Sequence, residues 1–185
     1  GPARAGVRAA GVDGREGLGR GPGRGMAAVR GLAVAGGWEL GLCGDLVIAA
    51  RSAKLGDAHA NFGLLPGGGS SVRLPRKIGP TRAKYLLFTG DFVPADDLVA
   101  CGLVNEVVDD AELTAAVERL AAKLGSKSSL VLRRMKALVA DGLEQPKEVD
   151  PRLELLASEV HAHSHDMKEG LAAFEQKHKP SFIGR

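Results

Sequence analysis

The chain has 185 residues, 44% hydrophobic but only 4% aromatic, which suits one domain with a core of Leu, Val, Ala and Ile. Its net charge of +3 does not indicate a nucleic-acid surface, because six arginines in residues 1–30 supply the excess and residues 31–185 carry about −1. Two isolated cysteines argue against a zinc site or a disulfide scaffold, and no apolar run is long enough to span a membrane. We expect a soluble, cytoplasmic protein that binds neither nucleic acid nor membrane.

Residues 1–25 consist of Gly and Arg with scattered Ala and show neither helical nor strand periodicity. Such a segment buries too little apolar surface to offset the entropy of ordering it. An arginine–glycine tail that binds nucleic acid is disfavoured, because no aromatic residue is interleaved. We predict that this segment is disordered or poorly packed. A cloning remnant, a truncated start or a mistranslated frame would account for it.

The stretch from Gly31 to Asp45 combines a strand, a glycine turn and a helix. Residues 27–34 form a run of small and β-branched residues, and residues 35–37 permit a tight turn. The following residues have apolar side chains at helical spacing, with Glu39 in the first turn. A helix N-terminus after such a turn directs backbone N–H groups toward an anion or a developing oxyanion.

A second glycine turn follows, at residues 67–69. Residues 46–50 and 53–56 are expected to be extended, and Ser70 or Ser71 is predicted to cap a helix that runs through Ile78. The turn lacks the Gly-Lys-Ser/Thr ending of a phosphate-binding loop, and neither glycine turn has the spacing of a dinucleotide site. Nucleotide binding is therefore not predicted.

The remainder of the chain is mostly helical. Capping-box patterns at Asp109–Glu112 and Asp166–Glu169 are expected to start two of the helices. The predicted segments are helices at 80–90, 94–100, 109–124, 128–140, 151–161 and 167–178, and one strand at 103–108. We predict an α/β region over residues 26–110 and a helical region over residues 111–185.

Few side chains are candidates for chemistry. Glu39 is either a catalytic carboxylate or a first-turn residue that stabilises its helix dipole. His59, just before the second glycine turn, is either a structural histidine or a proton donor. The His161, His163 and His165 group is better explained by a solvated helix end than by a metal site, and no residue pattern supports covalent catalysis.

Four motifs in order resemble the enoyl-CoA hydratase/isomerase (crotonase) family. They are AAVRGLAVAGGWELGLCGDLVIAA, FGLLPGGGSSVRLPRKIG, LLFTGDFVPADDLVACGLVNEVV and HDMKEGLAAFEQKHKPSF, and together they cover about residues 27–182. The resemblance implies an α/β fold with a repeated ββα spiral core and a C-terminal helical region used in trimerisation, often with two trimers per hexamer. It implies an acyl-CoA thioester as substrate and no separate cofactor, because coenzyme A is part of the substrate.

The resemblance also assigns roles to the two glycine turns. Gly36 matches the position that supplies one oxyanion-hole N–H, and Gly37 lies beside it in the substrate-binding turn. Glu39 matches the first catalytic glutamate of the hydratases, which activates water for addition to the β-carbon. Gly67 or Gly68 matches the turn that helps to place this water.

The resemblance also predicts roles for two further positions. His59 stands where the hydratases have their second glutamate, which handles the proton at the α-carbon, so isomerisation is less favoured than hydration. An imidazole could donate this proton near neutral pH. Lys179 lies in a segment that resembles the part of some members that contacts the nucleotide of coenzyme A.

The upstream portion of the family, with the first strands and the other oxyanion-hole N–H, is not recognisable in residues 1–25. We therefore predict an N-terminally incomplete member with an exposed sheet edge. Its expected activity is hydration of a 2-enoyl-CoA to a 3-hydroxyacyl-CoA. The alternatives are another crotonase-type reaction (decarboxylation, thioester hydrolysis or isomerisation) or a non-catalytic chain that assembles with complete members.

Overall fold

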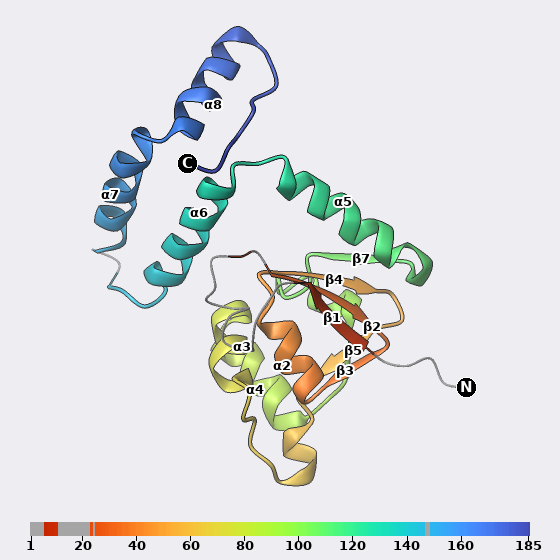
Figure 1. The fold of residues 1–185 in the computed structure, drawn as a ribbon. Helices are drawn as coiled ribbons and strands as arrows, with labels where there is room; N and C mark the ends of the chain where they lie inside the picture. The colour runs from red at the N-terminus through yellow and green to blue at the C-terminus, as the bar shows by residue number, and fades with distance from the viewer. Residues whose placement is uncertain (1–5, 11–22, 24, 147–148) are drawn as a thin grey trace. The chain divides into compact units, whose positions relative to one another are not determined.

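The computed structural model describes residues 6–10, 23, 25–146 and 149–185 (Figure 1). The chain divides into two compact units, Gly1–Arg119 and Leu120–Arg185. The boundary between the units lies inside helix α5 (Leu113–Gly125). No helix among the described residues is long and apolar enough to cross a membrane.

The described residues of the first unit form two sheets. The four-stranded sheet has the order β1-β2-β4-β7, in which β1 is antiparallel to β2 and the other neighbours are parallel. Its strands are β1 (Gly6–Ala10), β2 (Met26–Arg30), β4 (Leu46–Ala50) and β7 (Glu106–Val108). The three-stranded sheet has the order β3-β5-β6, with β3 parallel to β5 and β5 antiparallel to β6. Its strands are β3 (Leu32–Val34), β5 (Lys54–Gly56) and β6 (Val93–Pro94).

Successive passes of the chain each add one strand to each sheet and then turn into helix. The first pass is β2, β3 and α2 (Gly36–Leu42), and Gly31 at φ 66° separates its two strands. The second pass is β4, β5 and a helical segment made of the 3₁₀ helix η1 (His59–Phe62), α3 (Ser70–Ile78) and α4 (Pro80–Thr89). This repetition is the ββα spiral that the sequence resemblance implied, so the expected fold class is confirmed.

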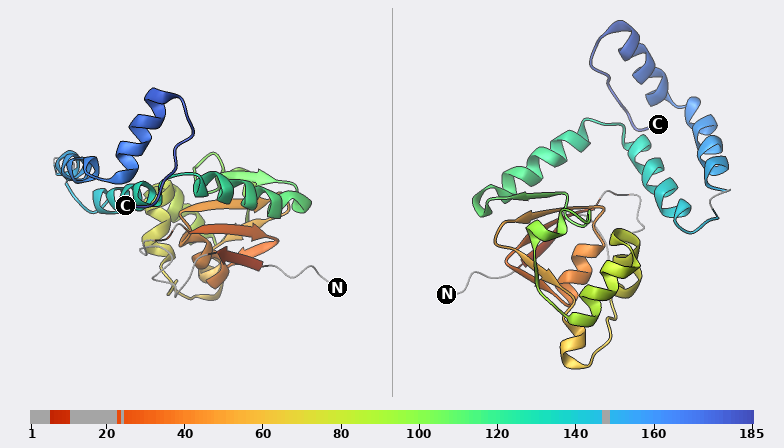
Figure 2. Two further views of the ribbon diagram at one scale, coloured as in Figure 1. Left: turned by 45° about the horizontal axis from the view of Figure 1, so that its top comes forward. Right: turned by 180° about the vertical axis from the view of Figure 1, so that it is seen from behind.

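Helix α2 lies between the strands and the α3–α4 pair (Figures 1 and 2). The apolar face of each element meets in one core, which contains Val29, Trp38, Leu74, Leu86 and Leu98, all at most 1% exposed. Two 3₁₀ helices, η2 (Ala95–Leu98) and η3 (Asp110–Glu112), flank β7. The strand predicted over 103–108 forms only in its second half, because Leu103 and Val104 instead close a turn on the Leu98 carbonyl.

The second unit is helical. It holds the end of α5, then α6 (Ser129–Gly142), α7 (Asp150–Ala162) and α8 (His165–Gln176). Helix α7 packs on both α6 and α8. Ser128 caps α6, with its Oγ accepting a hydrogen bond from the Val131 N–H at 3.2 Å.

Three local predictions are wrong. Residues 6–10, expected to be disordered with the rest of 1–25, form β1 against β2, while residues 1–5, 11–22 and 24 lie outside the described residues. Neither serine caps α3, whose N-cap is Gly69. Asp109 and Asp166 do not cap α5 and α8; η3 precedes α5, and Ser164 caps α8 by accepting from the Met167 N–H.

Candidate functional site

Two parallel strands bring the predicted site residues to one edge of the three-stranded sheet. In the β3–β5 pair, Val34 lies opposite Gly56, so the chain leaves both strands at the same end. The backbone N–H of Ala35 then donates to the Asp57 carbonyl at 3.2 Å. The carboxyl ends of parallel strands are the usual place for a ligand site in an α/β fold.

The turn after β3 places the start of α2 at this edge. Ala35 adopts φ 47° and ψ −119°, an uncommon conformation for a residue with a side chain, and Gly36 and Gly37 are the first two residues of the helix. Backbone N–H groups in the first turn of a helix have no acceptor within that helix. Because Gly36 is exposed, its N–H can meet a ligand oxygen, as the oxyanion-hole assignment requires.

Glu39 is buried, with 6% of its surface exposed, and its carboxylate reaches across to the second glycine turn. Its Oε1 accepts hydrogen bonds from the Gly68 N–H at 2.6 Å and from the Ser70 N–H at 3.4 Å. Helix α3 has no side-chain cap of its own, so the Glu39 carboxylate provides acceptors at its N-terminus. Glu39 thus joins the two glycine turns rather than serving only the dipole of its own helix.

The second glycine turn is fitted closely around this carboxylate. A Cβ placed on Gly68 would lie 2.2 Å from Glu39 Oε2, whereas a Cβ on Gly67 would meet no atom within 4 Å. Arg73 Nη1 donates to the Gly68 carbonyl at 2.5 Å and holds the turn from its other side. Only a glycine at position 68 allows the carboxylate to lie this close to the backbone.

His59 lies at the start of η1, directly after β5, and its Nδ1 is 2.7 Å from Asp57 Oδ1. The Asp57 carboxylate is 1% exposed, and Oδ1 also accepts from the His59 backbone N–H at 3.3 Å. Ala58, between the two residues, is in the left-handed region at φ 63°. The histidine predicted from the sequence therefore has a buried carboxylate as its partner.

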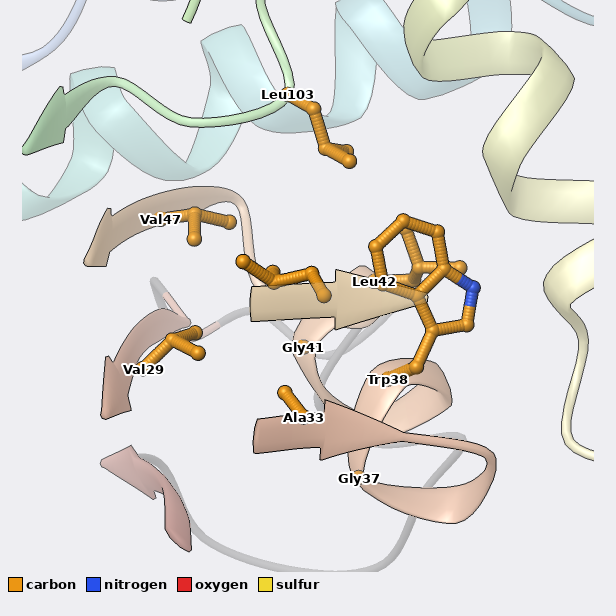
Figure 3. A pocket seen from close by; sticks show the side chains of 9 residues that line it. Val29, Ala33, Gly37, Trp38, Gly41, Leu42, Val47 and Leu103 are labelled. Atoms are coloured by element: carbon orange, nitrogen blue, oxygen red, sulfur yellow. The ribbon is translucent and has the colours of Figure 1, made fainter. Parts of the chain in front are cut away.

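A small cavity beside this site is part of the core (Figure 3). It has a volume of about 10 Å³ and is surrounded by apolar side chains and by Gly37 and Gly41 of α2. The side chains of Val29, Trp38, Leu42, Val47 and Leu103 line it in Figure 3. A space of this size holds no more than about one water, so it is not the place for an acyl chain.

Lys179 belongs to the second unit and follows α8. Together with Lys127 and Phe182 it lines a cavity of about 390 Å³ in that unit.

The structure thus joins Glu39 and Gly68 by a hydrogen bond. Gly36 begins the helix that holds Glu39, and His59 lies at the same sheet edge. Two contributors were not found from the sequence. Asp57 follows a short strand and lies in no recognised motif. Its position two residues before His59 is the sequence feature that could have identified it as a partner of the histidine. Arg73 lies on α3 with no pattern that would set it apart from other surface arginines.

Comparison with known proteins identifies the family of the chain. The sequence model of the enoyl-CoA hydratase/isomerase family matches residues 18–185, and the chain belongs to that family. The match begins before residue 27, where the visible resemblance started, and so includes the end of the Gly/Arg-rich segment.

Individual relatives have names that refer to enoyl-CoA or crotonyl-CoA hydratases. The chain is 40% identical over 160 residues to the crotonyl-CoA hydratase of Syntrophomonas wolfei, covering 86% of this chain and 62% of that protein. It is 36% identical over 164 residues to human enoyl-CoA hydratase domain-containing protein 2, mitochondrial, covering 86% and 56%. The crystal structure of an enoyl-CoA hydratase from Bacillus anthracis superposes with a TM-score of 0.88 at 35% identity, over 92% of this chain and 66% of that one. The chain therefore spans about three fifths of the length of these curated relatives.

Proposed function

We propose that the protein adds water across the double bond of a 2-enoyl-CoA thioester to give a 3-hydroxyacyl-CoA. The observation that carries this proposal is the Glu39 carboxylate, buried and held by the Gly68 N–H at the end of a parallel strand pair. A carboxylate fixed in this way can take a proton from water without first reorganising. The relative named as a crotonyl-CoA hydratase supports a short enoyl chain as the first substrate to test.

In this reaction, Glu39 removes a proton from water as the water oxygen bonds to the β-carbon. The electron pair of the double bond moves to the α-carbon and is delocalised onto the thioester oxygen. The N–H of Gly36 holds that oxygen, and His59 gives a proton to the α-carbon. Gly67 or Gly68 helps to place the water, and the Gly68 N–H orients Glu39. No cofactor takes part beyond the coenzyme A of the substrate, and Lys179 is proposed to contact its nucleotide.

The test is the variant Glu39→Gln, which keeps the size of the side chain and an acceptor for Gly68 but removes the base. Because a positioned general base contributes about 10²–10⁴-fold, kcat for hydration of crotonyl-CoA should fall by that range. The matched control is Glu118→Gln, an exposed position on α5. If Glu39→Gln hydrates crotonyl-CoA at the wild-type rate in a folded sample, Glu39 is not the base.

A panel of acyl-CoA substrates separates hydration from the other reactions that His59 could serve. Turnover of an α-carboxylated (malonyl-type) or a saturated thioester in place of crotonyl-CoA would indicate decarboxylation or thioester hydrolysis, respectively. Absence of any turnover, combined with co-purification with a complete family member, would indicate a non-catalytic partner. Binding of acetoacetyl-CoA, a stable ligand that resembles the enolate, shows by calorimetry whether the wild-type chain forms the pocket.

A further inference from the structure

The Asp57–His59 pair points to a residue of the site that no motif marks. We propose that Asp57 is a positioning residue, which holds the His59 ring by Nδ1 so that Nε2 is the atom that exchanges a proton with the substrate. This inference rests on the proposed hydration, in which His59 gives the proton to the α-carbon. It goes further by stating which ring nitrogen acts and which residue selects it.

The chemistry of the contact fixes the tautomer. An ionised carboxylate can only accept hydrogen bonds, so the 2.7 Å contact between Nδ1 and Asp57 Oδ1 requires a proton on Nδ1. A neutral imidazole carries one proton, so Nε2 is then the basic nitrogen. The ring can be protonated at Nε2 and can lose that proton again while its bond to Asp57 persists.

The backbone holds the two side chains in this arrangement. On an extended chain, residues two apart point to the same side but lie about 6–7 Å apart. Here Ala58, in the left-handed conformation with φ 63° and ψ −9°, reverses the chain between them. The Asp57 carbonyl is fixed in turn by the N–H of Ala35, the residue directly before Gly36. A non-glycine residue held at positive φ next to a site is a common sign of a position set by function.

Burial of the ionised Asp57 carboxylate destabilises the fold unless the carboxylate has a hydrogen-bond partner. Asp57 is 1% exposed, and its Oδ2 has no hydrogen-bond partner among the residues that the structure describes. Both oxygens of a buried carboxylate normally accept hydrogen bonds. Because Asp57 Oδ2 accepts none, we infer that the contact between Oδ1 and His59 has a purpose other than stability. The histidine side chain itself is 14% exposed and can be reached from outside.

The proton balance of the step is complete. His59, protonated on both nitrogens, transfers the Nε2 proton to the α-carbon while Glu39 takes a proton from the attacking water. The Nδ1 proton stays on the bond to Asp57 throughout. Afterwards the Glu39 proton is released to solvent and Nε2 takes one up, so each turnover adds one water to the substrate.

The first test needs no turnover. In protein labelled with ¹⁵N-histidine, the nitrogen shifts distinguish the two neutral tautomers, and His59→Gln identifies the signal among the five histidines. We expect the wild-type ring to carry its proton on Nδ1 and Asp57→Asn to increase the Nε2–H form, because an amide can donate to Nδ1. A wild-type ring with its proton on Nε2 overturns the proposal, whether or not the variant folds.

The second test is kinetic. Asp57→Asn should lower kcat for crotonyl-CoA hydration by roughly tenfold or more, with KM changed by less than about twofold, because general acid catalysis is lost and binding is not. The control Asp97→Asn, at an exposed position of η2, should change neither value. In the His59→Gln background, Asp57→Asn should have little further effect on kcat, since Asp57 acts through His59. A full additional loss there would overturn the positioning role.

The two proposals fail in different ways. A wild-type chain that does not hydrate crotonyl-CoA but shows the expected tautomers contradicts the proposed function and leaves the positioning by Asp57 intact. A wild-type chain that hydrates crotonyl-CoA and keeps its tautomer and kcat in Asp57→Asn contradicts the positioning alone.

Discussion

The contact between Gly68 and Glu39 shows how a position without a side chain can determine the geometry of a carboxylate. The Gly68 N–H lies 2.6 Å from Oε1, and the space in which a Cβ would stand is already filled by Oε2. The backbone of Gly68 is not in the left-handed region, so conformational freedom does not explain the glycine. The close approach of the Gly68 backbone to the Glu39 carboxylate explains the glycine.

Gly68→Ala should therefore displace the Glu39 carboxylate and lower kcat for hydration by about tenfold to a thousandfold, within the range expected for a mispositioned general base. The variant should stay folded, because the carboxylate can rotate away from the new methyl group. Steady-state kinetics together with circular dichroism measure both effects.

The matched control is Gly41→Ala on α2, where a Cβ would meet no atom within 4 Å. Replacing a helical glycine by alanine stabilises by about 0.5–1 kcal/mol, so this variant should keep its kcat and unfold at higher denaturant concentration. Equal loss of kcat in both glycine variants would show that the effect at position 68 does not act through Glu39.

At the scale of elements, residues that look alike in sequence take different roles in the structure. Asp166 and Glu169 have the spacing of a capping box, yet Ser164 is the N-cap of α8. The Asp166 carboxylate is instead buried, and it accepts hydrogen bonds from Ser128 Oγ and from the Ile183 and Gly184 N–H groups at 2.8 and 3.0 Å. It ties the C-terminal tail and the start of α6 to α8.

This network gives the second unit an acid-sensitive bond. Burial alone would raise the pKa of Asp166, but the hydrogen bonds from Ser128, Ile183, Gly184 and His165 outweigh it and hold the pKa below its usual value. A carboxyl whose pKa is lower in the folded state stabilises the fold fully above its unfolded pKa of about 3.9, and that contribution is lost as pH falls through the folded pKa.

Asp166→Ala should destabilise the second unit by roughly 2–4 kcal/mol at neutral pH, because the buried Ser128 hydroxyl and the Ile183 and Gly184 N–H groups lose a charged acceptor. The hydrogen-exchange protection factors of the Ile183 and Gly184 amides should fall accordingly, and the loss of protection below about pH 4 in the wild type should be smaller in the variant. Asp141→Ala, at an exposed position of α6, serves as the control. Unchanged protection of these two amides in Asp166→Ala would contradict this assignment.

The elements that the sequence predicts well are those whose signals are local. Gly36 and Gly90 mark the start of α2 and the end of α4, where the glycine turn and the C-cap were expected. Caps were predicted poorly, because tertiary contacts decide where a candidate capping side chain lies. Asp166 bonds to Ser128 instead, and the buried Ser70 Oγ has no hydrogen-bond partner among the described residues. The strand β1 was missed because its pairing with β2 is a tertiary contact that composition does not report.

The site residues also divide into those that local motifs mark and those that tertiary contacts determine. Glu39 and the glycine turns lie within short motifs, so the family pattern assigns them residue by residue. Asp57 becomes visible only when the left-handed Ala58 turns its carboxylate onto the His59 ring. The contact between Glu39 and Gly68 joins residues 29 apart in the sequence, and no spacing rule predicts it.

At the scale of the whole molecule, large apolar side chains are exposed on two neighbouring helices of the second unit. Leu155, Leu156 and Val160 on α7 are each about 60% exposed, and Phe174 on α8 is 85% exposed. Scattered apolar residues are ordinary on a surface, but several on two neighbouring helices favour contact with another chain. We propose that these helices contribute to a homotrimer, or to a hexamer of two trimers, as the family resemblance implied.

Sedimentation of the full chain should therefore give three or six times the mass of one chain at micromolar concentration. Leu156 and Val160 are four residues apart and share a face of α7, so Leu156→Glu combined with Val160→Glu should place two charges in the contact and shift the mass toward that of a monomer. The control Glu159→Gln, also exposed on α7, should leave the assembly unchanged. A wild-type chain that sediments as a monomer at every concentration contradicts the assembly. A double variant that stays trimeric instead shows that α7 lies outside the interface.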